Sequence, residues 1–245
     1  MHARALLHLQ AITRDYALGH TRVSALRGVD LTVSAGEFTV VTGPSGSGKT
    51  TLLNIIGCLD RATSGSYVLE GEEVAGRDFD ALADVRNRKV GFIFQSFNLI
   101  PVLDVAENIE LPCRLRPEQG GARARRALRA RVEALADAVG LTPYLHHKPD
   151  ELSGGQRQRV AIARALVTEP RLVLADEPTA NLDSATSQQI LDLMLRLNRE
   201  QGVTFLFSTH DPRVVAHAWR VLHIQDGRLA PGDFSTVSRR ASGAP

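Results

Sequence analysis

One segment constrains this chain more than any other: a glycine-rich run that ends in lysine and threonine. Residues 43–50 read GPSGSGKT, which matches the pattern GxxxxGK[ST] at every fixed position. An apolar run typical of a β-strand, residues 38–41, precedes it, and a stretch with helical apolar spacing, residues 52–56, follows it. A strand, a glycine-rich loop and a helix in this order predict a site for the phosphates of a nucleoside triphosphate.

Each residue type in this loop has a chemical reason. Glycines let the backbone wrap closely, so that successive N–H groups point at a phosphate, and the helix that follows adds the positive end of its dipole. We expect the ammonium of Lys49 to contact the β- and γ-phosphate oxygens and the hydroxyl of Thr50 to ligate Mg²⁺. The expected phosphate-binding residues are Gly43, Pro44, Ser45, Gly46, Ser47, Gly48, Lys49, Thr50 and Thr51.

Two adjacent carboxylates follow a second apolar run. Residues 172–175 read LVLA, as expected for a strand that is buried on both faces, and Asp176 and Glu177 come next. The carboxyl ends of parallel strands are where open α/β sheets bind ligands. We therefore expect Asp176 to hold Mg²⁺ through its water shell and Glu177 to act on the attacking water, which predicts hydrolysis and not merely binding.

The rest of the chain alternates between helical and strand patterns. Apolar residues at helical spacing predict amphipathic helices over residues 122–139 and 184–200. A strand is predicted over 203–207, and Asp226-Gly227 predicts a hairpin within 221–229. This order indicates an α/β fold with a mainly parallel sheet.

Composition excludes several classes of protein. The 245 residues carry a net charge of +2, which argues against strong nucleic-acid binding, and the arginines of 122–139 are interpreted as a solvated face. No apolar run approaches the length of a membrane span, and the N-terminus becomes polar too early for a signal peptide. The two cysteines, Cys58 and Cys113, are expected to be core residues of a protein in a reducing compartment.

The segment Leu152-Ser153-Gly154-Gly155-Gln156 points to a family. With the phosphate loop and Asp176-Glu177, it resembles the nucleotide-binding subunit of an ABC transporter, from Tyr16 to about Gly227. The resemblance implies a P-loop NTPase fold with a RecA-like core, an N-terminal antiparallel β subdomain and an inserted α-helical subdomain. It implies one domain over residues 1–234, with the helical subdomain at about 85–166, and the small polar segment 235–245 is expected to be a disordered tail.

The same resemblance implies roles for further residues. Tyr16 lies where the family stacks an aromatic ring on adenine, and Gln95 matches the glutamine that links Mg²⁺ and water to the helical subdomain. Asp183, in the family's D-loop, is expected near a dimer interface, and His210 matches the histidine that contacts the γ-phosphate. The implied catalytic residues are Lys49, Gln95, Glu177 and His210, and the implied Mg²⁺ ligands are Thr50, Gln95 and Asp176.

The segment 152–156 has a physical logic of its own. Ser153, Gly154, Gly155 and Gln156 would open a helix that stops before Pro170, and such a helix N-terminus is a second anion site. One chain does not need two sites of this kind for a γ-phosphate. In the family, this segment of one subunit closes on the ATP of another, which implies a head-to-tail homodimer around two MgATP.

Four further runs indicate a branch of the family. Residues 56–61, 63–65, 94–99 and 176–184 resemble the macrolide-export and lipoprotein-release branch, in which the ATPase drives a permease that has a large periplasmic domain. Because this chain ends at residue 245 without a span, we expect a separate permease and a peripheral location on the cytoplasmic face of the membrane. The branch implies export, extraction or mechanotransmission, whereas the identity of the transported molecule depends on the permease.

Two other functions fit parts of the pattern. Relatives of this branch that act in cell division use nearly the same motifs to signal across the membrane and activate cell-wall hydrolases. A soluble ABC ATPase of DNA repair or translation usually carries a long coiled-coil insertion or two tandem cassettes, and neither fits in 245 residues.

Overall fold

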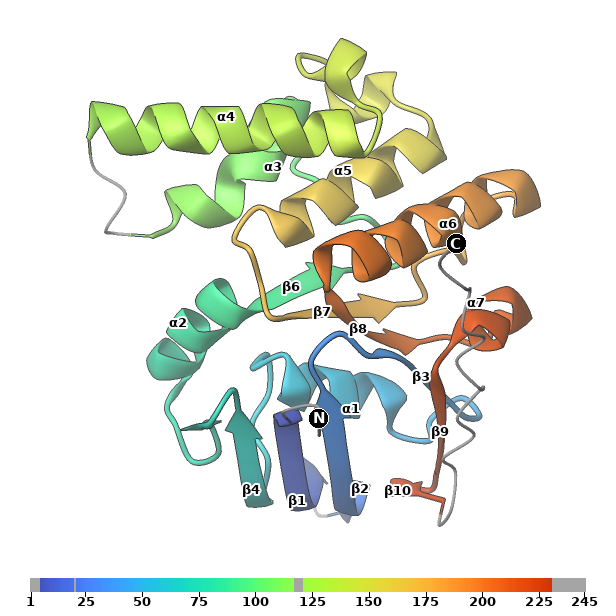
Figure 1. Cartoon of the computed structure of the whole chain (residues 1–245). Helices are drawn as coiled ribbons and strands as arrows, with labels where there is room; N and C mark the ends of the chain where they lie inside the picture. Colours follow the sequence, from blue (N-terminus) through green and yellow to red (C-terminus); the bar gives the residue numbers. More distant parts are fainter. Residues whose placement is uncertain (1–4, 20, 117–120, 231–245) are drawn as a thin grey trace, which may run out of the picture. The chain divides into compact units, whose positions relative to one another are not determined.

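The computed structural model describes residues 5–19, 21–116 and 121–230. The chain divides into two compact units. Unit 1 comprises Met1–Arg77 together with Thr204–Pro245, and unit 2 comprises Asp78–Val203. Figure 1 labels most of the helices and strands of both. The tail expected at 235–245 lies outside the described residues.

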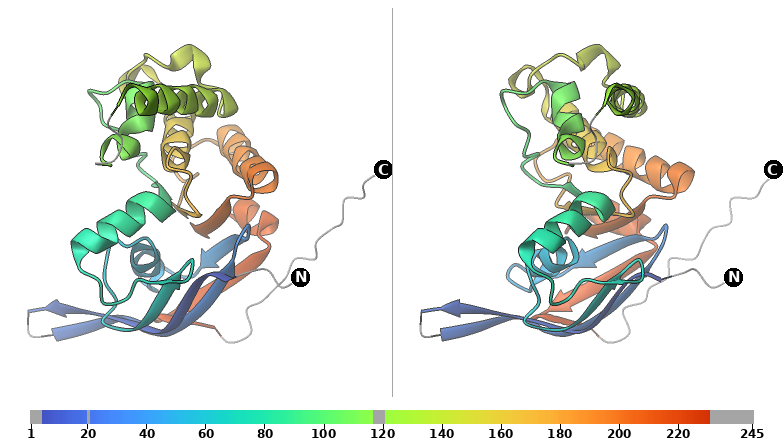
Figure 2. Two further views of the ribbon diagram at one scale, coloured as in Figure 1. Left: turned by 60° about the vertical axis from the view of Figure 1, so that its left-hand side comes forward. Right: turned by 90° about the vertical axis from the view of Figure 1, so that its left-hand side faces the viewer.

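Unit 1 contains an antiparallel sheet in the order β2-β1-β4-β5. Its strands are β1 (Ala5–Leu18), β2 (Thr21–Ser34), β4 (Ser64–Leu69) and β5 (Glu72–Glu73). Figure 2 shows β1 and β2 as a long antiparallel pair. In β2, Leu26, Val29, Leu31 and Val33 are buried while most residues between them face solvent, so one face of the sheet covers the core. This sheet matches the expected N-terminal β subdomain.

The phosphate-loop strand belongs to a second group of strands in unit 1. β3 (Phe38–Thr42) pairs in parallel with both β8 (Thr204–Ser208) and β9 (Arg220–Gln225). β10 (Arg228–Leu229) pairs antiparallel with β9, which confirms the predicted hairpin at Asp226-Gly227. The helices of this unit are α1 (Lys49–Ile56) and α7 (Pro212–His217).

Unit 2 combines two parallel strands with five α-helices in its described residues. β6 (Val90–Ile93) pairs in parallel with β7 (Leu172–Asp176). The helices are α2 (Phe79–Lys89), α3 (Val105–Arg114), α4 (Ala122–Ala138), α5 (Gly154–Leu166) and α6 (Ser184–Gln201). Short 3-10 turns, η1 (Thr142–Tyr144) and η2 (Pro149–Glu151), lie between α4 and α5.

Most of the elements predicted from the sequence are present. The helices expected at 122–139 and 184–200 are α4 and α6, and the strand expected at 203–207 is β8. The arginines at the start of α4 are exposed, and both cysteines are buried, as expected. Unit 2 contains the helical segment expected at about 85–166 and, in addition, the first part of α2, β7 and α6.

Three α-helices of the described residues were not predicted, namely α2, α3 and the short α7. α2 begins at Asp78, whose carboxylate accepts a hydrogen bond from the backbone N–H of Ala81. α3 contains Pro112, which argues against a helix, but Asp104 and Glu107 form a reciprocal capping box that fixes its first turn. Within the described ranges, no helix is both long and apolar enough to cross a lipid bilayer.

Candidate functional site

The phosphate loop of unit 1 has a backbone that only glycine can adopt. Gly43 has φ 153°, and a Cβ placed there would lie 2.1 Å from the carbonyl oxygen of Ile224 in β9. Gly46 and Gly48 have φ 76° and 108°, both in the left-handed region. The loop is also tied to the β9–β10 turn, since the N–H of Gly227 donates to the carbonyl of Ser47 at 2.9 Å. Each of these positive φ angles in the loop therefore coincides with a glycine in the sequence.

The N-terminus of α1 is open to an anion. Gly48 is its N-cap, and within the described part of the chain no side chain caps the helix; its first turn also contains no acidic residue. The first backbone N–H groups of a helix lack intrahelical acceptors, and they carry the positive end of the dipole. Thr50 is exposed at this end and Thr51 is half-buried. These donors are available to a phosphate.

Two side chains of the loop are arranged as a phosphate would require. The ammonium of Lys49 donates to the carbonyls of Gly43 at 2.8 Å and Pro44 at 2.9 Å, so it lies over the loop itself. The hydroxyl of Ser47 is buried and has no hydrogen-bond partner among the described residues. A cation held over the loop and an unsatisfied buried hydroxyl fit a bound triphosphate.

His210 lies at the same edge of the strands as the phosphate loop. It follows β8, which is the parallel neighbour of β3, and the N–H of Thr209 donates to the carbonyl of Val41 at 3.3 Å. His210 is exposed, whereas Thr209 is fully buried. The carboxyl ends of β3 and β8 therefore bring the loop and His210 to one sheet edge.

Tyr16 is held in place by two charged neighbours on the antiparallel sheet. Its hydroxyl donates to Asp60 Oδ2 at 2.7 Å, and the guanidinium of Arg14 lies over its ring, 4.4 Å from the centroid. Arg14 and Asp60 also form an ion pair at 2.8 Å. The ring is half-buried, and one of its faces is covered by Arg14. No local sequence pattern indicates the contact between Tyr16 and Asp60.

In unit 2, Asp176 and Glu177 stand at the end of β7. Asp176 is the last residue of the strand, and both carboxylate side chains are half-buried. Glu177 has φ 45°, an uncommon conformation for a residue with a side chain, and it precedes Pro178. Such backbone strain occurs preferentially at functional sites.

Gln95 emerges beside these carboxylates. β6 runs parallel to β7 with Ile93 opposite Ala175, so Gln95 leaves the same sheet edge as Asp176. Gln95 is exposed, and its backbone carbonyl accepts a hydrogen bond from Asn181 Nδ2 at 3.0 Å. Asn181 was not predicted as a site residue. It links the segment after β7 to the segment after β6.

The segment 152–156 begins α5 as predicted. Ser153 is the N-cap: its hydroxyl accepts from the N–H of Gln156 at 3.3 Å, and Gln156 Oε1 accepts from the N–H of Ser153 at 2.8 Å. A Cβ at Gly155 would lie 2.5 Å from Thr186 Cγ2, and one at Gly154 would lie 3.3 Å from Leu182. The glycines therefore permit close packing of this helix end against the start of α6.

Asp183 has a structural task in addition to the predicted one. It is the N-cap of α6, where its carboxylate accepts from the N–H groups of Ala185 at 3.0 Å and Thr186 at 2.9 Å. The hydroxyl of Thr186 also donates to it at 2.6 Å. These hydrogen bonds, the one from the Thr186 hydroxyl first, lower the pKa of Asp183, which is exposed.

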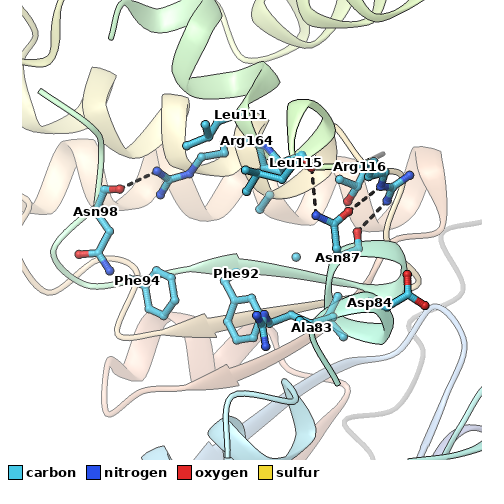
Figure 3. Close-up of a pocket in the computed structure, with 16 residues that line it drawn as sticks. Ala83, Asp84, Asn87, Phe92, Phe94, Asn98, Leu111, Leu115, Arg116 and Arg164 are labelled. Atoms are coloured by element: carbon cyan, nitrogen blue, oxygen red, sulfur yellow. Dashed lines mark hydrogen bonds between the residues drawn. The ribbon is translucent and has the colours of Figure 1, made fainter. Parts of the chain in front are cut away.

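A cavity of about 600 Å³ lies in unit 2 next to the segment that contains Gln95. Figure 3 shows its lining, which includes Phe92 and Phe94, whose rings stack with centroids 5.4 Å apart. At one end of the cavity, Arg116 donates to Asn87 Oδ1 at 2.5 Å. At the other end, Arg164 donates to the carbonyl of Asn98. The lining is mainly apolar between two arginines.

Comparison with known proteins gives a consistent family. The family profile described as "ABC transporter" matches residues 26–180. The chain is 48% identical over 241 residues to "Macrolide export ATP-binding/permease protein MacB" of Syntrophobacter fumaroxidans, which aligns over 96% of this chain and 33% of that protein. It is 46% identical to "Lipoprotein-releasing system ATP-binding protein LolD" of Anaeromyxobacter dehalogenans, over 93% of each. The chain thus spans about a third of the first relative and nearly all of the second.

A solved structure has the same fold. The protein is similar to the ATP-binding cassette MJ0796, described as a dimer in a post-hydrolysis state bound to ADP and Pi. The TM-score is 0.82 with 42% sequence identity, and the match covers 91% of this chain and 96% of that one. The predicted α/β fold of the P-loop ABC ATPase kind is confirmed.

Proposed function

The chain belongs to the ABC transporter family, and on that premise we propose that it is the ATPase subunit that drives a separate transmembrane permease of the macrolide-export or lipoprotein-release type. Membership of the family makes it an ATP-binding ATP hydrolase. The observation that carries the proposal is the loop between β3 and α1, whose glycine backbone and Lys49 are suited to a triphosphate. We further propose a single ATPase domain over residues 1–234.

We propose that ATP binds with its phosphates on residues 43–51. The N–H groups of the loop and of the first turn of α1 contact the phosphate oxygens, and Lys49 exchanges its two carbonyl partners for the β- and γ-phosphates. Tyr16 presents the ring face that is turned away from Arg14 to the adenine. His210, at the edge next to the loop, contacts the γ-phosphate.

For hydrolysis, we propose roles for Thr50, in the first turn of α1, and for residues at the ends of β6 and β7. Thr50, Gln95 and Asp176 would hold Mg²⁺, which when bound neutralises charge on the phosphate oxygens. Glu177 accepts the proton of the attacking water. The side-chain oxygens of Thr50, Gln95 and Asp176 are ligands of the kind that Mg²⁺ prefers.

We propose that two copies of the chain close head to tail around two ATP. The N-terminus of α5, opened by Ser153, Gly154 and Gly155, supplies an anion site that the chain's own phosphate loop leaves unused. To reach a γ-phosphate, the Ser153 hydroxyl would exchange its long bond to Gln156, 3.3 Å, for the ligand. The segment around Asp183 would lie near the interface between the copies.

The cavity in unit 2 supports the expected link to a permease. It begins at the turn after Gln95 and is lined mainly by apolar groups, which suits a helix with an apolar face. We propose that residues 95–101 and this cavity receive a cytoplasmic helix of the permease. In this proposal the chain lies on the cytoplasmic face of the membrane, and closure of the two ATPase copies performs mechanical work on the permease.

The proposal is tested by nucleotide binding and hydrolysis. Purified wild-type chain should hydrolyse MgATP, whereas Lys49→Ala should raise the Kd for ATP by about tenfold to a hundredfold, since hydrogen bonds to charged groups are worth about 1.5–3 kcal/mol. Lys148→Ala, an exposed lysine outside the loop, is the control and should bind ATP as the wild type does. Unchanged ATP affinity in Lys49→Ala would refute the assignment of the loop. Purification of the native complex should also yield a membrane-spanning partner.

A further inference from the structure

The turn that follows Gln95 has an unusual backbone. Phe97 and Asn98 have φ 60° and 50°, so two consecutive residues with side chains lie in the left-handed region. Asparagine tolerates this conformation, but for a bulky residue such as phenylalanine it is an outlier. The turn is internally bonded only by short-range contacts, Phe97 N–H to Phe94 O at 3.2 Å and Asn98 N–H to Ser96 O at 2.6 Å. Such a backbone persists only where surrounding structure imposes it.

Helix α5 supplies that structure. The guanidinium of Arg164 donates through its two terminal nitrogens to the carbonyls of Asn98 and Phe97, both at 2.6 Å. Figure 3 shows Arg164 reaching from the helix to Asn98 across one end of the cavity. The planar fork of an arginine donates to two adjacent carbonyls along fixed directions, whereas an ammonium is a point charge without a fixed fork.

A second arginine of the same helix contacts the same turn. The guanidinium of Arg157 lies over the ring of Phe97, 5.5 Å from its centroid. Burial lowers the pKa of Arg164. It nevertheless stays charged at neutral pH, because arginine titrates far above that range. A desolvated cation is costly unless it is hydrogen-bonded, so the two carbonyls and the arginine fix one another.

The other side of Gln95 is fixed as well, by the bond from Asn181 to its carbonyl. The backbone around Gln95 is therefore fixed by two sets of hydrogen bonds, one from Asn181 after β7 and one from Arg164 in α5. α5 begins at Ser153 and carries Arg157 and Arg164 along its length. One rigid helix thus connects the proposed ATP contact of the partner subunit to the turn beside Gln95.

We propose that Arg164 is a positioning residue, which imposes the left-handed turn at Phe97-Asn98 and thereby fixes Gln95 and transmits movement of α5 to it. The inference rests on the proposed function, because it gives Gln95 its value in hydrolysis. Arg164 touches neither nucleotide nor water in this role. It acts through the backbone of residues 95–98.

The test uses the full-length chain with Arg164→Ala and two readouts. Hydrogen–deuterium exchange should rise in the peptides that cover residues 94–100, because the carbonyls of Phe97 and Asn98 lose their hydrogen bonds from Arg164. The kcat for MgATP should fall by about tenfold to a hundredfold with little change in KM, since displacing a catalytic group by about 1 Å can cost a hundredfold. The phosphate loop lies in unit 1 and should keep its ATP affinity.

Arg159→Ala is the matched control. Arg159 lies on the same helix and donates to the carbonyl of Val139 at 2.9 Å, so its loss removes a comparable bond that does not reach the turn. It should leave exchange at residues 94–100 and kcat at wild-type values. Arg164→Lys keeps the charge but not the fork, and should recover only part of the kcat.

A rescue variant separates positioning from general stability. Glycine adopts positive φ without strain, so Asn98→Gly added to Arg164→Ala should restore part of the kcat and of the exchange protection. The inference is overturned if Arg164→Ala keeps wild-type kcat and exchange, or if it loses ATP affinity to the same extent as kcat. A wild-type chain that hydrolyses no ATP would instead refute the proposed function.

Discussion

The side-chain amide of Asn181 donates to the backbone carbonyl of Gln95 at 3.0 Å. These residues follow the adjacent parallel strands β7 and β6, and 86 positions separate them in the sequence. Because the donor belongs to the segment that contains Asp183, the bond joins the stretch expected near a dimer interface to the stretch expected to reach Mg²⁺ and the permease. We therefore expect a displacement of the segment around Asn181 to displace Gln95 as well, and the reverse.

The first prediction concerns this bond. Asn181→Ala should lower kcat for MgATP by about tenfold, because a mispositioned Gln95 costs catalysis more than binding. The Kd for ATP should not change, and the free energy of unfolding should fall by only about 0.5–1.5 kcal/mol. Steady-state kinetics and urea unfolding measure both. Gln188→Ala, which removes a hydrogen bond to Asp192 within α6, is the control; an equal loss of kcat in both variants would contradict the role of Asn181.

The second prediction concerns the support of Tyr16. Tyr16→Ala should weaken ATP binding by the value of one base-on-aromatic stack, about 1–3 kcal/mol. Asp60→Ala leaves the ring but removes the acceptor of its hydroxyl and the partner of Arg14, so it should weaken binding by a smaller factor. Isothermal titration calorimetry measures both Kd values. Wild-type affinity in Tyr16→Ala would show that the ring does not contact the nucleotide.

The third prediction concerns Gly43. Gly43→Ala places a Cβ 2.1 Å from the carbonyl oxygen of Ile224, so β9 or the loop must move. Overpacking of this kind costs about 1–3 kcal/mol, and ATP binding should be lost with it. Gly71→Ala is the control, because Gly71 has φ 79° but no atom near the added Cβ. The free energies of unfolding of both variants, measured in urea, separate the steric clash at Gly43 from the cost of placing alanine at positive φ. Equal destabilisation of the two variants would contradict the close approach of Gly43 to Ile224.

The fourth prediction is a pH dependence. The hydrogen bonds from Thr186 and Ala185 lower the pKa of Asp183 in the folded chain, so the unfolded chain binds its proton more readily. The stabilisation from the charged cap is then present above about pH 4, the ordinary range of an aspartate, and is lost as the pH falls through the lower folded value. The difference in unfolding midpoint between wild type and Asp183→Asn should shrink on acidification from pH 7 to pH 3. A difference that stays constant would contradict it.

The parts of the site that could be predicted from the sequence are those whose chemistry depends on residues close together in the chain. The loop at 43–50 needs glycines at fixed spacing because the backbone itself binds phosphate, and Ser153 and Gln156 form a capping box four residues long. Patterns of this kind can be read from the residues alone. Local patterns predicted where β3 and β7 end and where α5 begins.

Contacts between distant residues were not predictable in this way. No local pattern indicates that Arg164 reaches Phe97 and Asn98, which lie 67 and 66 positions away, or that Tyr16 bonds to Asp60. The left-handed backbone at Glu177 is imposed by its surroundings and precedes a proline, where sequence preference points elsewhere. α3 is a different case: its capping box, Asp104 and Glu107, is local, but Pro112 argues against a helix and concealed it.

The central claim is that this chain hydrolyses ATP between two copies of itself, and Glu177→Gln tests it most directly. The variant keeps the residues proposed to bind ATP but lacks the base, so its kcat should fall by about 10²–10⁴-fold. With ATP present it should elute from size-exclusion chromatography as a stable dimer, whereas the exposed-surface control Glu133→Gln should hydrolyse ATP normally and show no trapped dimer. A Glu177→Gln chain that stays monomeric with ATP and hydrolyses it at the wild-type rate would contradict the account.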